Sequence, residues 1–121
     1  MNTQADLFSA PVPRIKTIID HAKEYPDLFS SSFISWLPDN LHIWNAFAAE
    51  ALKVRARGYK HYSARTIIEH LRHHSALTES TGEWKINNNN TTPLAHLFDL
   101  RYPENAGLFE YRVKGNANAD E

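Results

Sequence analysis

The sequence predicts a mainly α-helical fold with a small two-stranded β element. Two observations predict the helices: apolar residues recur at three- and four-residue steps, and Pro, Gly or capping residues delimit the stretches that contain them. A third observation predicts the strands, because two short segments near the end of the chain have alternating polarity or many aromatic and β-branched residues. At 121 residues, the chain has the usual length of one domain with one hydrophobic core.

The domain is expected to occupy residues 13–113. Leu7 and Phe8 are the only neighbouring pair of large apolar residues within residues 1–12, and Pro11 and Pro13 punctuate the chain, so we expect residues 1–12 to form a flexible arm. Residues 114–121 are expected to form a disordered tail.

Five helices are predicted within the domain, each from the spacing of its apolar residues. Their expected ranges are residues 13–25, 26–38, 40–58, 63–74 and 92–102. The first residues of the last three helices are typical of helix N-termini, where a short polar side chain accepts a backbone N–H bond. The candidate N-caps are Asp39 or Asn40 for the third helix, Ser63 for the fourth, and Thr91 or Thr92 for the fifth.

Two strands are predicted beside the last helix. Residues 84–87 alternate polar and apolar side chains, residues 108–113 are aromatic and β-branched, and the two segments are expected to pair. Two short strands beside three helices resemble a winged helix-turn-helix. The order differs in one respect, since a standard winged helix places both strands after its third helix and here one of them precedes it.

Composition and motifs exclude several classes of function. The chain has no Cys, and therefore no disulfide and no Cys-based metal site. It contains no P-loop, no Gly-x-Ser-x-Gly and no His-Glu-x-x-His, so we expect no catalytic residues, no cofactor and no enzyme activity. His70, His73 and His74 have helical spacing, but the sequence fixes no further ligand, and no metal site is expected.

The sequence also predicts a cytoplasmic protein without membrane contact. No apolar run approaches the roughly 18 residues that span a bilayer, and the first residues lack the pattern of a secretory signal.

Positive charge is concentrated between residues 53 and 74. This segment carries six basic side chains and one acid, Glu69, whereas the whole chain has a net charge of -1. A local positive surface attracts phosphate by releasing counterions, so we expect nucleic acid, duplex DNA in particular, as the partner. The residues expected to contact phosphate are Arg55, Arg57, Lys60, Arg65 and Lys85. As alternatives, these residues form a solvated face or bind an acidic protein surface.

A run of Asn and Thr residues precedes the last predicted helix. Free N–H groups at a helix N-terminus bind phosphate, and Asn pairs with adenine in the major groove. We therefore expect Asn88, Asn89, Thr91 and Thr92 to contact a phosphate or a base edge. The alternative is a structural role, because Asn is common in turns.

Residues 4–8, Gln-Ala-Asp-Leu-Phe, resemble the linear motif by which bacterial replication and repair proteins dock on the DNA polymerase sliding clamp. The resemblance implies that Gln4, Asp6, Leu7 and Phe8 bind the clamp, with the two apolar side chains in a hydrophobic pocket. As alternatives, Leu7 and Phe8 pack against the core of this protein or bind another partner.

A second resemblance covers about half of the chain. It is carried by Lys60-His61-Tyr62-Ser63-Ala64-Arg65, Lys85-Ile86-Asn87-Asn88-Asn89, Pro103-Glu104 and Gly107-Leu108-Phe109-Glu110-Tyr111-Arg112. These segments are similar to a group of small, mostly uncharacterised phage and bacterial proteins, which implies a phage or bacterial setting and no particular activity. The sequence thus predicts a small DNA-associated accessory protein. The alternative is a protein-binding modulator or inhibitor of a host enzyme or nucleoprotein.

Overall fold

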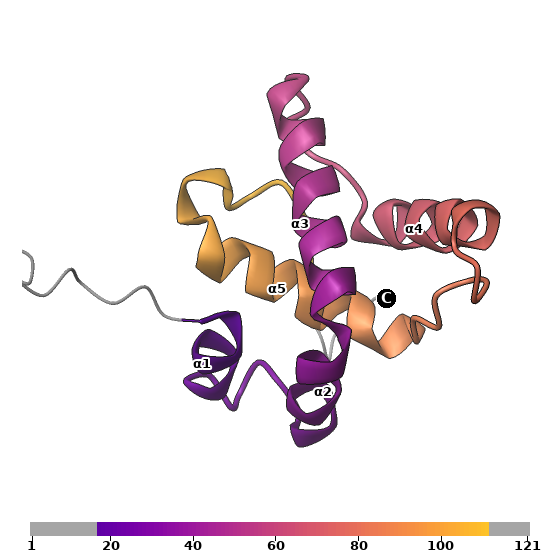
Figure 1. Cartoon of the computed structure of the whole chain (residues 1–121). Coiled ribbons are helices and arrows are strands. Elements are labelled where there is room, and N and C mark those ends of the chain that lie inside the picture. Colours follow the sequence, from indigo (N-terminus) through magenta and orange to yellow (C-terminus); the bar gives the residue numbers. More distant parts are fainter. Residues whose placement is uncertain (1–16, 112–121) are drawn as a thin grey trace, which may run out of the picture.

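The computed structural model describes residues 17–111 as helices joined by short irregular segments (Figure 1). The α-helices are α1 (Ile18–Lys23), α2 (Ser31–Trp36), α3 (Leu41–Ala56), α4 (Ala64–Thr78) and α5 (Thr91–Arg101). Short 3₁₀ helices occupy Leu37–Asn40, Asn88–Asn90 and Pro103–Asn105. Each predicted range therefore contains an α-helix. The second begins later than expected, because residues 26–30 form a turn before α2, and the fourth continues four residues beyond His74, its expected end.

Hydroxyl side chains cap three of the helices. Thr17, Ser30 and Ser63 each accept a bond from the backbone N–H three residues later, at 3.1, 3.1 and 3.2 Å. Asn40, a candidate cap for α3, makes no such bond, because its Nδ2 donates to the Trp36 carbonyl at 2.8 Å. The 3₁₀ helices before α3 and α5 lead directly into them, so these two helices begin without a side-chain cap.

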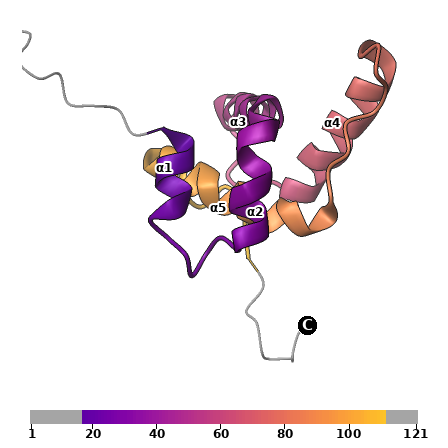
Figure 2. The same ribbon diagram turned by 60° about the horizontal axis from the view of Figure 1, so that its bottom comes forward.

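Helix α5 lies at the centre of the packing, in contact with α1, α3 and α4. Figure 2 shows α1 and α4 on opposite sides of α3. Apolar side chains from all five α-helices and from the segment after α5 form one core. Its largest fully buried side chains are Phe29, Phe33, Leu37, Ile43, Phe47, Ile68, Leu94, Leu97, Phe98 and Leu108.

The predicted two-stranded β element is wrong, and with it the winged-helix topology. Residues 17–111 contain no β-strand. The backbone groups that would have paired are bound elsewhere: Ser75 Oγ accepts from the Trp84 N–H at 2.9 Å, and the Arg72 guanidinium donates to the Ile86 carbonyl. The Leu108 carbonyl accepts from the Tyr62 N–H at 2.9 Å, so residues 108–111 lie against the α3–α4 connection and not against residues 84–87.

The segment between α4 and α5 is held to α4 by the buried hydroxyl of Ser75. This residue is 1% exposed, and its Oγ donates to the Arg72 carbonyl at 3.0 Å while it accepts from Trp84. Beyond this anchor, the Trp84 ring meets the ring of His42 edge to face, with centroids 5.1 Å apart. Ser75 thus couples the last turns of α4 to the path of the chain toward α5.

We expect Ser75→Ala to lower the free energy of unfolding by about 1–3 kcal/mol, because it leaves the Trp84 N–H without its partner in a part-buried position. Urea unfolding followed by circular dichroism measures the change. Ser35→Ala is the matched control, since Ser35 is an exposed serine in α2 and should change stability by less than about 0.5 kcal/mol. Equal stability of the two variants would contradict a role for Ser75 as an anchor.

Within residues 17–111, no helix combines the length and the apolar character needed to cross a membrane.

Candidate nucleic-acid interface

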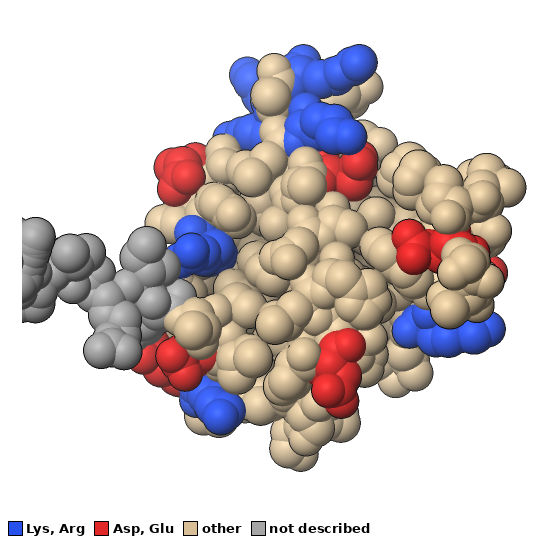
Figure 3. Space-filling model, in the orientation of Figure 1, with Lys and Arg blue, Asp and Glu red and all other residues tan. Residues whose placement is uncertain are grey.

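Basic side chains gather where α3 ends. Lys53 and Arg55 lie in the last turn of α3, Arg57 follows the helix, and Lys60 lies in the turn beyond it. Figure 3 shows these Lys and Arg side chains grouped at one end of the molecule. Glu50 pairs with Lys53 at 2.9 Å, whereas neither Arg57 nor Lys60 forms an ion pair with the described residues. This end of α3 therefore carries a net positive charge.

A fixed turn holds these cations. Gly58 has φ +97°, a left-handed conformation that is strained for any residue with a Cβ, so glycine permits the chain to reverse after α3. Arg55 Nη1 donates to the carbonyls of Tyr59 and Lys60 at 3.2 and 3.3 Å. Arg55 therefore shapes the turn, while Arg57 and Lys60 extend from it as exposed side chains.

The α3–α4 connection links this basic end to a groove. The Tyr59 ring packs edge-on against Tyr62 at 5.4 Å, and the Tyr62 N–H bond to Leu108 fixes the connection to the segment after α5. Ser63 then caps α4, which begins at the groove. The cavity has a volume of about 1090 Å³. Its walls are the connection, the first turns of α4 and α5, the α1–α2 turn and residues 109–111.

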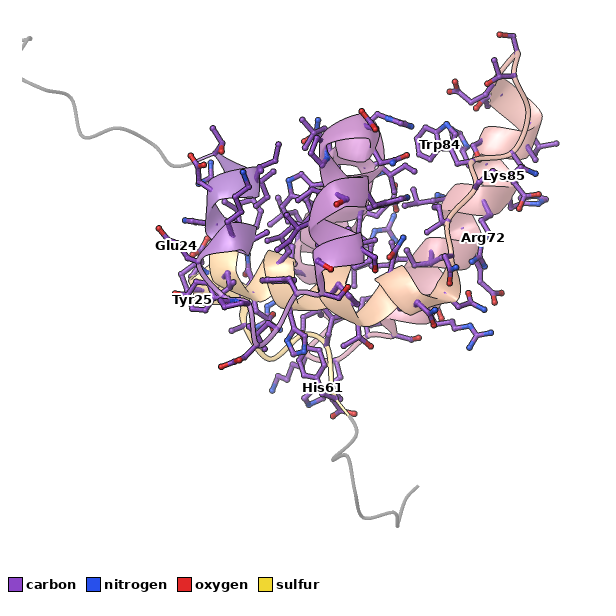
Figure 4. The ribbon with its side chains drawn as sticks, turned by 90° about the horizontal axis from the view of Figure 1, so that it is seen from below. Glu24, Tyr25, His61, Arg72, Trp84 and Lys85 are labelled. Atoms are coloured by element: carbon purple, nitrogen blue, oxygen red, sulfur yellow. The ribbon has the colours of Figure 1, made fainter. Side chains whose placement is uncertain are left out.

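The structure divides the predicted nucleic-acid residues among four places. The end of α3 carries Arg55, Arg57 and Lys60, and the groove is lined by Arg65, Asn88, Thr91 and Thr92. Lys85 borders a smaller cavity of about 330 Å³ beside Arg72. Asn89 is exposed in the short helix before α5. The groove therefore unites Arg65 with three of the four Asn and Thr residues, although 23 or more positions separate them in sequence. Figure 4 shows Lys85 and Arg72 on the α4 side and His61 near the point where the described chain ends.

The groove contains both positively and negatively charged side chains. Arg65 pairs with Glu69 at 3.4 Å, but both side chains are about 60% exposed, so the pair is weak and leaves Arg65 free to bind another anion. His61 Nδ1 lies 3.3 Å from an oxygen of Glu110, and Asp27 lies on the groove wall formed by the α1–α2 turn. The buried Oγ1 of Thr91 has no hydrogen-bond partner among the described residues.

Tyr111 is held in a fixed orientation at the edge of the groove. Its ring stacks on His96 with centroids 4.2 Å apart and planes 7° from parallel, and its hydroxyl donates to Asp99 Oδ2 at 2.6 Å. Burial and the Asp99 carboxylate together raise the pKa of Tyr111, so the phenol stays protonated as a donor. Burial lowers the pKa of His96 against the opposing effect of Asp99, which favours a neutral imidazole under the tyrosine ring.

The sequence did not identify Arg72, His96 or Tyr111 as site residues. Arg72 is one of six basic residues in the charged segment 53–74. Nothing in the local sequence indicates that it, and not another of the six, binds the Ile86 carbonyl and the Asn88 side chain. Tyr111 was assigned to a strand, and its partner His96 lies fifteen positions earlier on a helix. Stacking between segments so far apart has no sequence signal.

Two further expectations concern the N-terminal arm and the histidines. Gln4, Asp6, Leu7 and Phe8 lie outside the described residues. Among residues 17–111, no three His, Asp or Glu side chains are placed to hold a metal ion. His70 stacks on His74 at 5.9 Å and lies 3.8 Å from Glu50.

Comparisons of the chain with protein-family models, curated proteins and solved structures found no match.

Proposed function

We propose that the protein binds DNA and contacts its phosphates through a basic strip formed by Arg55, Arg57, Lys60 and Arg65. The observation that supports this proposal is the position of these cations in the last turn of α3, in the α3–α4 connection and in the first turn of α4. This connection leads from the end of α3 into the groove, and only Arg65 has a carboxylate partner among the described residues.

The dimensions of the basic strip suit a polyanion. Lys60 and Arg65 are five residues apart, so their backbones are at most about 18 Å from one another. Duplex DNA carries one charge per roughly 1.7 Å of axis, so cations spread over even part of this distance face several phosphates at once. Each cation that meets a phosphate releases a counterion, which makes binding favourable at low salt and sensitive to added salt.

Phosphate contacts alone do not select a duplex. The described residues do not have the winged-helix topology that the sequence suggested. Phosphate contacts position a protein on nucleic acid and carry no direct information on sequence. The proposal is therefore limited to DNA binding through the basic strip.

We expect the double variant Arg57→Gln, Lys60→Gln to bind DNA about tenfold more weakly than wild type and to reduce the slope of log affinity against log salt by about 2. Fluorescence anisotropy with a labelled oligonucleotide, titrated at several salt concentrations, gives both quantities. Both side chains are exposed and lie outside the core, so the fold should be unchanged.

Lys23→Gln is the matched control for the single variant Lys60→Gln, since Lys23 is an exposed lysine in the last turn of α1. The proposal predicts a lower salt slope for Lys60→Gln and an unchanged slope for Lys23→Gln. Identical slopes would refute the assignment of the basic strip. Absence of salt-sensitive binding by wild type would instead favour the alternative partner, an acidic protein surface. Docking of Gln4, Asp6, Leu7 and Phe8 on a sliding clamp rests on the sequence motif and stays a prediction.

A further inference from the structure

The groove contains a rigid aromatic surface. His96 covers one face of the Tyr111 ring, and the bond to Asp99 fixes the ring in its plane. Tyr111 is nevertheless 38% exposed and lines the groove. Because the parallel stack with His96 occupies one face of the ring, a ligand that stacks on Tyr111 meets its other face.

Another part of the groove suits a phosphate group. Arg65 lines it, and α4 begins there. Ser63 binds the N–H of Thr66 with its hydroxyl and that of Ile67 with its carbonyl. The N–H groups of Ala64 and Arg65 have no partner within the helix and are available to an anion. Arg65 supplies the full charge that a helix N-terminus lacks.

We propose that the groove holds one unpaired nucleotide of single-stranded DNA, with its base stacked on Tyr111 and its phosphate at Arg65 and the first turn of α4. This inference rests on the proposed function, because the basic strip leads the DNA backbone from the end of α3 to the groove. It goes further by assigning a class of DNA: the faces of a paired base are covered by its neighbours in a duplex, so only an unpaired base reaches the tyrosine ring. The volume of about 1090 Å³ is large enough for a nucleotide.

The acidic side chains of the groove limit where the phosphate lies. Asp27 belongs to the α1–α2 turn, and Glu110 is next to Tyr111 and paired with His61. Both carboxylates repel a phosphate, whereas a neutral base tolerates them. The charges thus favour the orientation in which the base lies toward Tyr111 and the phosphate toward Arg65.

The test compares one oligonucleotide as a single strand and as a duplex, with 2-aminopurine as the fluorescent base. Tyr111→Ala is expected to lower the affinity for the single strand about tenfold, the usual effect of removing one stacked ring, and to change the affinity for the duplex less than twofold. Wild type should quench 2-aminopurine in the single strand, and Tyr111→Ala should not. Tyr111→Phe keeps the ring and loses the bond to Asp99, so it should still quench 2-aminopurine and should bind the single strand more tightly than Tyr111→Ala.

Tyr25→Ala is the matched control, since Tyr25 is 42% exposed in the turn after α1 and does not line the groove. Equal losses for single strand and duplex on Tyr111→Ala, or a loss with Tyr111→Phe as large as with Tyr111→Ala, would overturn the stacking role. Retained single-strand affinity in Tyr111→Ala would overturn it as well, while leaving the basic strip intact. Failure of wild type to bind either DNA would refute both proposals.

Discussion

Phe98→Ala is expected to lower the free energy of unfolding by about 3–5 kcal/mol, the usual cost of removing a buried aromatic ring. Phe98 lies on α5 and is 0% exposed. Its ring meets Phe109 edge to face at 5.6 Å and Tyr102 at 5.2 Å. Because α5 contacts α1, α3 and α4, the surrounding helices cannot close the cavity without losing contacts of their own. A domain of this size is typically stable by about 5–15 kcal/mol, so the loss is a large share of the total.

Urea unfolding monitored by circular dichroism and by tryptophan fluorescence measures this change. Leu77→Ala serves as the control, since Leu77 is 73% exposed at the end of α4 and should change stability by less than about 0.5 kcal/mol. Phe98→Leu fills part of the cavity and should fall between the two. A cost below about 1 kcal/mol for Phe98→Ala would mean that α5 is not the centre of the core.

The helices could be predicted from the sequence because their signals are local. Ser63 caps α4, as its position just before an apolar pattern indicated. Gly58 lies in the turn that follows α3, close to the predicted end of that helix. The sequence predicted that the fourth helix ends at about His74, whereas α4 continues through Ser75 to Thr78. In the structure the Ser75 hydroxyl bonds the carbonyl of the preceding turn and the next loop, which places a polar residue on the buried face.

The strands could not be predicted reliably because strand pairing depends on distant partners. Residues 84–87 have the alternation of a strand, yet Arg72 and Ser75 bind the backbone groups that a ladder would need. Both side chains lie on α4, about ten residues earlier in the sequence, and their bonds to the backbone of residues 84–87 compete with strand pairing. Nothing in the local pattern of residues 84–87 shows that competition.

The sequence predicted the positive charge of the candidate site but not its shape. The excess of positive charge between residues 53 and 74 is plain in the sequence, and three of the five predicted cations lie together at the end of α3. The grouping of Arg65 with Asn88 depends on how α4 and α5 meet. That geometry follows from core packing and from Arg72, which binds Asn88 directly.

Arg72→Met is expected to lower the free energy of unfolding by about 2–3 kcal/mol and to loosen the segment that carries Asn88. The Arg72 guanidinium donates to the Ile86 carbonyl and to Asn88 Oδ1, the latter at 2.7 Å. Hydrogen bonds from a charged donor are each worth about 1.5–3 kcal/mol, and partial exposure of Arg72 reduces their sum. Ile86 is buried, so loss of the bond beside it also weakens an apolar anchor of the segment. Urea unfolding measures the cost, and hydrogen exchange at residues 84–90 measures the loosening.

Arg65→Met separates this effect from the general loss of an arginine on α4. Arg65 lies on the same helix, but its only ion pair within residues 17–111 is with an exposed Glu69, and its replacement should cost less than about 1 kcal/mol. Asn88→Ala removes one of the two acceptors and should cost less than Arg72→Met. In a double-mutant cycle, the two sites should be coupled by at least about 0.5 kcal/mol, because the side chains are in direct contact. Additive costs for Arg72→Met and Asn88→Ala would show that the contact between these two side chains does not hold residues 84–90 in place. The position of Asn88 in the groove would then depend on the packing of α5 alone.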